Sequence, residues 1–320
     1  MPETLLETRD LSRYFRLAGP WGRGPLLKAV EGVNISVQAG ETLGLVGESG
    51  CGKSTLGRLV LALLPPTGGR VWFGGEELSA LPKSRLKHLR RQMQIVFQDP
   101  YSSLNPRLMV RQILEEPYII HGLGDRAARR DWVAELLTEV GLGEEHLERY
   151  PHEFSGGQRQ RLGIARALAL KPRLIVADEP VSALDVSIQA QILNLLADLQ
   201  KRHGLTYLFI SHDLSVISQI SDRVAVMYLG RLVETATRSV FDAVRLHPYT
   251  EALLAAVPLP DPERPFRPPE LKGDPPSPIN IPSGCPFHPR CPEAQLPICR
   301  EVVPEYRETA AEHWVSCHFR

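Results

Sequence analysis

The segment from residue 47 to residue 55 constrains the fold of this chain more than any other. It matches the pattern G-x-x-x-x-G-K-[ST], in which glycines let the backbone curl so that several N–H groups point at one anion. The flanking residues predict a buried strand over 42–46 and a helix over 53–64, whose positive N-terminal end adds to the attraction. The nine residues are Gly47, Glu48, Ser49, Gly50, Cys51, Gly52, Lys53, Ser54 and Thr55.

Two side chains of this segment indicate which anion it binds. Lys53 can reach the β- and γ-phosphates of a nucleotide, and the Ser54 hydroxyl can coordinate the Mg²⁺ ion that accompanies them. The pattern by itself indicates only a P-loop NTPase, a class with many activities. Other residues must therefore narrow the function.

The composition excludes several classes of protein. Of the 320 residues, 43% are hydrophobic, which allows a packed core and excludes wholesale disorder. Lys plus Arg and Asp plus Glu both total 37, so no net charge attracts the whole chain to nucleic acid. No apolar run reaches the ~18 residues that a membrane-spanning helix needs, and the N-terminus shows no signal-peptide pattern. We therefore expect a cytoplasmic protein.

Short apolar runs alternate with helical patterns up to about residue 255, which predicts an α/β domain over 1–255. Nine prolines between 258 and 278 exclude a regular helix or central strand there, so 256–320 is expected to be a separate extension. Besides 42–46, strands are expected over 70–73, 94–97, 174–177, 207–211 and 223–227. Besides 53–64, helices are expected over 126–140, 156–170, 188–203 and 249–257.

Polar residues stand at the ends of these expected elements. Ser155 is a good N-cap for the helix over 156–170, and Gly156 and Gly157 leave its first turn open to a ligand. Asp178 and Glu179 follow the strand over 174–177, where parallel sheets bind ligands. Asp178 would hold Mg²⁺, and Glu179 would orient or deprotonate an attacking water.

Single residues in similar places complete the set. Gln98 follows the strand over 94–97, and His212 follows the strand over 207–211. Gln158 ends the Ser-Gly-Gly-Gln motif, and Asp185 ends a Ser-Ala-Leu-Asp motif at 182–185. Each is unspecific alone, because a lone histidine is usually a surface residue and a Ser-Gly-Gly-Gln motif is usually a plain capped helix.

In this order, over residues 5–255, the motifs resemble those of the ABC ATPase family. The resemblance implies an α/β P-loop NTPase fold with a RecA-like core, an antiparallel β subdomain and an α-helical subdomain. By this resemblance, residues 47–55 form the Walker A motif and residues 155–158 form the signature motif. ATP hydrolysis with Mg²⁺ is the activity that it implies.

The resemblance also assigns roles to single residues. Gln98 becomes the Q-loop glutamine and a Mg²⁺ ligand, Asp178 the Walker B aspartate, and Glu179 the catalytic glutamate. Asp185 belongs to the D-loop, and His212 becomes the switch histidine that senses the γ-phosphate. Phe15 would stack on adenine, with Tyr14 as the alternative and a plain core role as the second alternative.

The family's mode of action implies partners. Two such subunits close around two ATP molecules, each lending its signature motif to the other's phosphate loop. The dimer, homomeric or heteromeric, would sit on the cytoplasmic face of the inner membrane. There it would drive two permease subunits supplied by an extracytoplasmic binding protein, without contact to nucleic acid.

Three segments resemble the oligopeptide/dipeptide importer branch of the family, at 98–106, 150–154 and 247–250. That branch also contains nickel and oligosaccharide importers, so the cargo stays open. The residues at 54–58 favour its F-type ATPase over the D-type one. An exporter subunit and a soluble ABC ATPase of DNA repair or translation are the other readings, although a single cassette without a long coiled coil argues against the latter.

Four of the five cysteines follow the proline-rich stretch, at Cys285, Cys291, Cys299 and Cys317. Disulfides are rare in the cytoplasm, and the closely spaced cysteine pairs typical of zinc sites are absent. Four thiolates suit zinc or an iron–sulfur cluster, and free thiols are the third reading. The family resemblance implies a [4Fe–4S] cluster of structural role. The possible substitute ligands are His288, His313 and His318.

Overall fold

Three strands made almost wholly of apolar residues lead to the polar residues singled out above. In the computed structural model these strands are β4 (Thr42–Val46), β8 (Leu174–Asp178) and β9 (Thr206–Ser211), and all their residues are buried. Strands covered on both faces read as continuous apolar runs, whereas half-exposed strands alternate. The sequence therefore predicted these three strands to within one residue at each end.

The structure describes residues 3–19, 24–99, 103–241, 244–256 and 273–320. The chain divides into two compact units, which we treat separately. The first unit comprises 1–38, 42–80 and 210–320, and the second comprises 39–41 and 81–209. Most of the proline-rich stretch and residues 100–102, which belong to the importer-like segment at 98–106, lie outside the described residues.

The first unit contains two sheets. In one, the long strand β1 pairs antiparallel with β2, β3 and β5, and β5 pairs with β6. In the other, β4 lies parallel to β10, and the order continues through β11 and β13 to β12. The remaining strands are β1 (Thr4–Arg16), β2 (Leu26–Val33), β3 (Ser36–Gln38), β5 (Gly68–Phe73), β6 (Glu76–Glu77), β10 (Arg223–Tyr228), β11 (Arg231–Thr237), β12 (Tyr306–Ala310) and β13 (His313–Ser316).

The helices of the first unit are short. The helix after the phosphate loop ends at Val60 rather than at the expected residue 64, because Ala62 takes a positive φ of 51° and the following residues form a tight turn. The helices are α1 (Lys53–Val60), α8 (Leu214–Ile220), α9 (Arg238–Phe241), α10 (Pro248–Ala255) and α11 (Ile298–Glu301), with a 3-10 turn at Leu78–Ala80.

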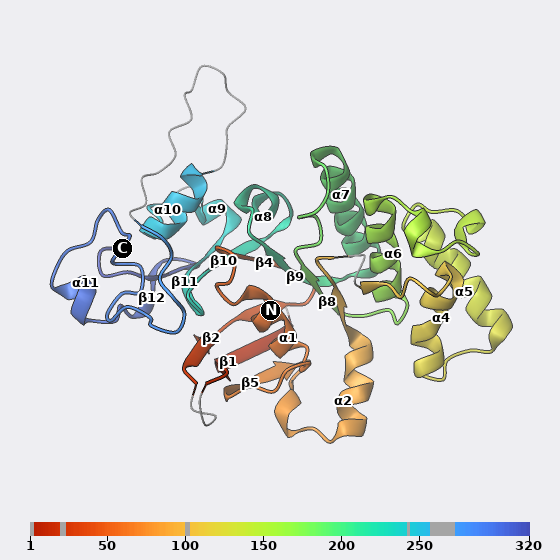
Figure 1. Cartoon of the computed structure of the whole chain (residues 1–320), viewed down its shortest axis with the longest axis horizontal. Coiled ribbons are helices and arrows are strands. Elements are labelled where there is room, and N and C mark those ends of the chain that lie inside the picture. Colours follow the sequence, from red (N-terminus) through yellow and green to blue (C-terminus); the bar gives the residue numbers. More distant parts are fainter. Residues whose placement is uncertain (1–2, 20–23, 100–102, 242–243, 257–272) are drawn as a thin grey trace, which may run out of the picture. The chain divides into compact units, whose positions relative to one another are not determined.

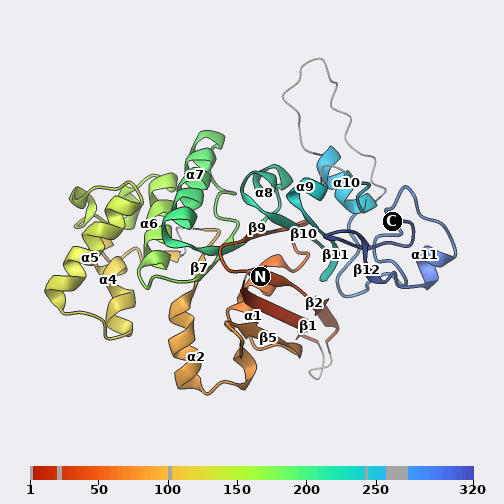
Figure 2. The same cartoon turned by 180° about the vertical axis from the view of Figure 1, so that it is seen from behind.

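The C-terminal residues 273–320, which we call the tail, are part of the first unit's sheet. Strand β13 pairs antiparallel with β11, and β12 pairs with β13 (Figures 1 and 2). The pairing buries a side-chain hydrogen bond, because His313 Nε2 lies 2.7 Å from Glu234 Oε1 and both side chains are almost fully inaccessible. The tail is therefore docked on the domain and is more than a surface linker.

The second unit contains β8, β7 (Met93–Val96) and the part of β9 up to Phe209, with β7 and β8 parallel. Its helices are α2 (Lys83–Leu89), α4 (Val110–Ile120), α5 (Arg126–Glu139), α6 (Gly156–Leu168) and α7 (Val186–His203), with 3-10 turns at Arg90–Gln92, Glu144–His146 and Pro151–Glu153. Helices α4, α5 and α6 lie together in both views, whereas α2 stands apart from them (Figures 1 and 2). None of the helices in the described part of the chain has the length and apolar character that crossing a bilayer requires.

Candidate functional site

The phosphate loop is a tight turn around the Lys53 ammonium group. Lys53 Nζ donates to the carbonyl oxygens of Gly47 at 2.7 Å and Glu48 at 3.0 Å, and the side chain is buried. Gly52, the N-cap of α1, has a φ of 110°, and a Cβ there would lie 2.0 Å from the carbonyl oxygen of Ala29. Only glycine fits this position without moving the backbone of β2.

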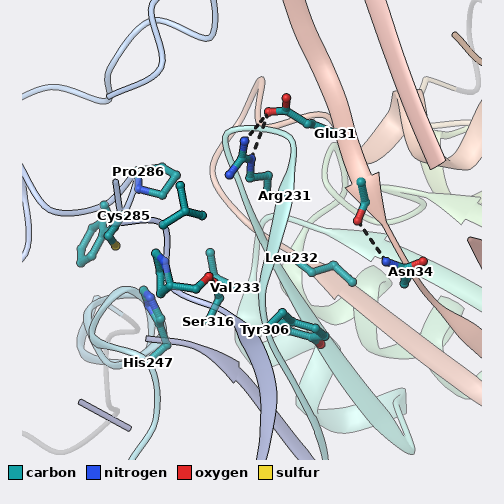
Figure 3. A pocket seen from close by; sticks show the side chains of 14 residues that line it. Glu31, Asn34, Arg231, Leu232, Val233, His247, Cys285, Pro286, Tyr306 and Ser316 are labelled. Carbon is teal, nitrogen blue, oxygen red and sulfur yellow. Dashed lines mark hydrogen bonds and ion pairs between the residues drawn. The ribbon is translucent and has the colours of Figure 1, made fainter. Parts of the chain in front are cut away.

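Backbone hydrogen bonds join the turn between β10 and β11 to the phosphate loop and to β2. The N–H of Gly230 donates to the carbonyl of Cys51 at 2.9 Å, and the N–H of Glu31 donates to the carbonyl of Gly230 at 2.8 Å. Arg231 binds the Glu31 carboxylate through two contacts of 2.8 and 3.0 Å, drawn in Figure 3. Burial raises the pKa of the Cys51 thiol, so this residue packs as a neutral side chain.

Glu48 faces the C-terminal part of the chain. Its carboxylate accepts two hydrogen bonds of 3.0 Å from the guanidinium of Arg290 in the tail. Its backbone N–H donates to the hydroxyl of Tyr249 in α10 at 2.9 Å. Neither Arg290 nor Tyr249 was predicted as a site residue, because nothing in the sequence links positions about 200 residues apart.

The carboxylate site of the second unit lies at the end of β8. Asp178 is 5% exposed, and Glu179 has a φ of 48°, an uncommon conformation for a residue with a side chain. Gln98 Nε2 donates to Glu179 Oε2 at 2.9 Å, so the structure brings two of the predicted catalytic residues together. The backbone strain and this hydrogen bond both fix the direction of the glutamate.

The Ser-Gly-Gly-Gln motif opens α6 with a capping box. The Ser155 hydroxyl accepts from the N–H of Gln158 at 3.3 Å, and the Gln158 side chain accepts from the N–H of Ser155 at 3.0 Å. A Cβ at Gly157 would lie 2.6 Å from the side chain of Ile188 on α7, so the glycine also permits close helix packing. The N-cap prediction for Ser155 is therefore confirmed.

The remaining predicted residues occupy exposed or half-exposed places. His212 is exposed just after β9, and Asp185 is exposed at the N-cap of α7. The Arg13 guanidinium lies 4.7 Å from the centre of the Phe15 ring, and the Lys28 ammonium lies 5.7 Å from the Tyr14 ring. The adenine-stacking role of either ring remains a prediction.

The two units thus hold different parts of the predicted site. The phosphate loop, His212 and Phe15 belong to the first unit. Gln98, the carboxylates that end β8, the Ser-Gly-Gly-Gln motif and Asp185 belong to the second. The catalytic and binding roles of all these residues remain predictions.

The four tail cysteines converge. All four line one enclosed cavity of about 20 Å³, together with His288 and His318, and none is in a disulfide. Burial, with a smaller contribution from the neighbouring cysteines, raises the pKa of Cys285 and of Cys291 to about 11, so both are neutral thiols near pH 7.

This convergence does not amount to a metal site. Within the described ranges, no group of three or more His, Cys, Asp or Glu side chains is arranged to hold a metal ion. The predicted cluster therefore gains no support from this arrangement. Of the proposed substitute ligands, His313 is bound to Glu234 instead and does not line the cavity.

Comparisons with known proteins agree with this geometry. Residues 30–182 match the family described as ABC transporter, and residues 233–299 match the family described as oligopeptide/dipeptide transporter, C-terminal region. The chain is 53% identical to the oligopeptide transport ATP-binding protein AppF of Bacillus subtilis, covering 99% of this chain and 97% of that protein. It is 54% identical to the probable peptide ABC transporter ATP-binding protein y4tS of Sinorhizobium fredii, covering 100% and 91%.

Solved structures show the same fold. A dimeric post-hydrolysis structure of the ATP-binding cassette MJ0796 with ADP and Pi matches 73% of this chain and 99% of its own, with a TM-score of 0.65 and 29% identity. The cbiO1 protein of Clostridium perfringens, part of an ABC transporter complex, matches 75% of this chain and 92% of its own, with a TM-score of 0.65 and 28% identity.

Replacing Gly52 by alanine is expected to weaken nucleotide binding. The new methyl group would require a shift of the Ala29 carbonyl and a costly φ, so we expect ATP affinity to fall at least about tenfold, equivalent to ~1.4 kcal/mol. Gly75→Ala is the matched control, because Gly75 also has a positive φ but a Cβ there meets no atom within 4 Å. Titration with a fluorescent ATP analogue measures both variants, and equal affinities would contradict the steric argument.

Proposed function

The chain belongs to the ABC transporter family, and on this basis we propose that it is the ATP-hydrolysing subunit that powers the import of di- or oligopeptides. The ABC ATPase fold and the whole-length similarity make it an ABC-type ATPase. The proposed cargo class rests on the match of residues 233–299 to the oligopeptide/dipeptide transporter C-terminal region. Import of nickel or of a sugar is the alternative within the same branch.

The chain's own residues supply the means to position ATP and water. Lys53 binds the β- and γ-phosphates, while loop N–H groups and the N-terminus of α1 orient them. Glu179, held by Gln98, orients or deprotonates the water that attacks the γ-phosphorus. The bond from that phosphorus to its bridging oxygen breaks, and ADP and phosphate leave.

We propose three polar side chains as ligands of the ion that accompanies ATP. The Ser54 hydroxyl, the Gln98 amide oxygen and the buried Asp178 carboxylate offer the oxygen ligands that Mg²⁺ prefers. When bound, Mg²⁺ offsets the negative charge that develops on the phosphates.

A second ATPase subunit completes the site in this proposal. Ser155 and the N-terminus of α6 are presented by a rigid capping box, which suits them to contact a γ-phosphate held by the facing subunit's loop. Exposed Asp185 and His212 would lie near the same interface. The similar cassette MJ0796 is dimeric, which supports closure around nucleotide as the working step.

The closing and opening of the two ATPase subunits is transmitted to permease subunits at the membrane. We propose that the segment after Gln98 contacts their cytoplasmic loops and that the chain is peripheral on the inner membrane. An extracytoplasmic binding protein then delivers the cargo. In this organisation 1–255 is the ATPase domain and 256–320 is an importer-type extension.

The test of this function is transport by the reconstituted complex. Vesicles that contain both ATPases, both permease subunits and the binding protein are expected to accumulate a labelled tri- or tetrapeptide only with ATP. Labelled Ni²⁺ and a labelled disaccharide serve as the competing cargoes. Uptake of either competitor without peptide uptake would overturn the cargo class and leave the ATPase assignment intact.

Replacing Glu179 by glutamine is expected to separate binding from hydrolysis. The amide cannot take a proton from water, so ATP turnover is expected to fall by about 10²- to 10⁴-fold while ATP still binds. The variant is also expected to accumulate ATP-bound dimers, which size-exclusion chromatography measures. Near-normal turnover in Glu179→Gln would remove this residue from its role.

We further propose the four tail cysteines as ligands of a [4Fe–4S] cluster, with zinc as the second candidate. Their convergence on one cavity supports this, whereas the arrangement of their side chains does not. A bound group would cross-link three segments of the tail. Protein purified without oxygen is expected to contain iron, and Cys291→Ser is expected to lose it. Zinc in place of iron would favour the second candidate, and metal-free protein would rule out both.

A further inference from the structure

The tail reaches the phosphate loop through one buried ion pair. Arg290 and Glu48 form a bidentate pair with two contacts of 3.0 Å, and the arginine side chain is only 7% exposed. Two parallel hydrogen bonds between a guanidinium and a carboxylate fix orientation as well as distance. A loop residue next to Gly47 is therefore held by a residue 242 positions later in the chain.

Aromatic rings surround this pair. Tyr228 at the end of β10, Tyr249 of α10 and Phe287 of the tail lie with ring centres 4.7 to 5.4 Å apart. Burial raises the pKa of the Tyr228 hydroxyl, and the neighbouring Arg290 guanidinium opposes that rise. Tyr249 accepts the N–H of Glu48, so the backbone and the side chain of Glu48 are both anchored.

The anchored residue is one of those that hold the phosphate-binding lysine, Lys53. The carbonyl of Glu48 accepts from Lys53 Nζ at 3.0 Å and from the N–H of Cys51 at 3.2 Å. A rotation of Glu48 would therefore move the groups that set the curvature of the loop and the position of the ammonium. Loops whose binding conformation is only partly populated bind their ligand more weakly in proportion.

We infer that Arg290 is a positioning residue for ATP binding: through Glu48 it keeps the phosphate loop in its phosphate-binding conformation. The tail is then coupled to the nucleotide site rather than being a separate appendage. The same ion pair also neutralises a carboxylate beside the bound phosphates, which acts in the same direction. This inference depends on ATP hydrolysis and not on the cargo, so its failure would leave the peptide-import proposal untouched.

The test uses Arg290→Gln in the full chain, assembled with its transporter partners. We expect the KM for ATP to rise roughly tenfold, with kcat at saturating ATP within about twofold of the unmodified protein, because the catalytic residues are unchanged. Arg290→Lys is expected to restore part of the loss, since lysine keeps the charge without the planar fork.

Arg320→Gln is the matched control. Arg320 forms a second bidentate pair within the tail, with Glu293 at 2.9 and 3.0 Å. The other polar contacts of its side chain in the described part of the chain are with Glu251 and the carbonyl of Leu246, and neither residue belongs to the phosphate loop. Both variants are expected to lower the midpoint of thermal unfolding, but only Arg290→Gln is expected to raise KM. An equal rise in both would show a general effect of tail stability and would overturn the inference.

Glu48→Gln keeps the inference testable if Arg290→Gln does not fold. It removes the same ion pair from the loop side and leaves the tail sequence intact, so it is also expected to raise KM. If the two residues act as a unit, the double variant is expected to be no worse than the poorer single one. Additive effects on KM, or an unchanged KM in Glu48→Gln, would overturn the proposed positioning role.

Discussion

The architecture of the nucleotide site depends on how closely backbone segments approach the phosphate loop. A Cβ at Gly52 would meet the Ala29 carbonyl of β2, and one at Gly47 would lie 2.2 Å from the Met227 carbonyl of β10. One strand from each of the two sheets of the first unit therefore lies in close contact with the loop. Close packing of this kind restricts the loop to one conformation. The loop therefore does not have to rearrange when a phosphate binds.

The tail contributes to the same framework. It extends the sheet through β13, buries the hydrogen bond between His313 and Glu234, and places Arg290 beside the loop. Glu234 also accepts the N–H of His247, the residue that caps α10. The N-terminus of α10, the tail strands and the loop are thus joined by buried polar contacts, each costly to break because its partner would remain desolvated.

The carboxylate site of the second unit follows a different principle. Glu179 is held by a strained backbone and by the amide of Gln98, rather than by dense packing. Strain of this sort persists only where surrounding structure fixes it, and it is common at catalytic positions. Gln98 binds the candidate base and precedes the segment that we propose to contact the permease subunits, so it would link hydrolysis to motion.

Local signals gave most of the architecture. Buried strands such as β4 and β8, the capping box of Ser155 and the loop glycines depend on neighbours a few residues away, so pattern and turn chemistry were sufficient to predict them. Strands β1 and β12 were missed because charged residues interrupt their apolar pattern, and β13 was missed because its four residues are too few to show a pattern. Pairing with distant strands decides the conformation of all three.

The sequence by itself determined the ABC ATPase fold and the order of its motifs, because each motif encodes its own local geometry. Only the tertiary structure decided which distant residues meet. It joined Arg290 and Tyr249 to Glu48, paired the tail strands β12 and β13, and grouped four cysteines around one cavity. Contacts across about 200 residues depend on how the whole chain packs, and no local spacing in a single sequence encodes them.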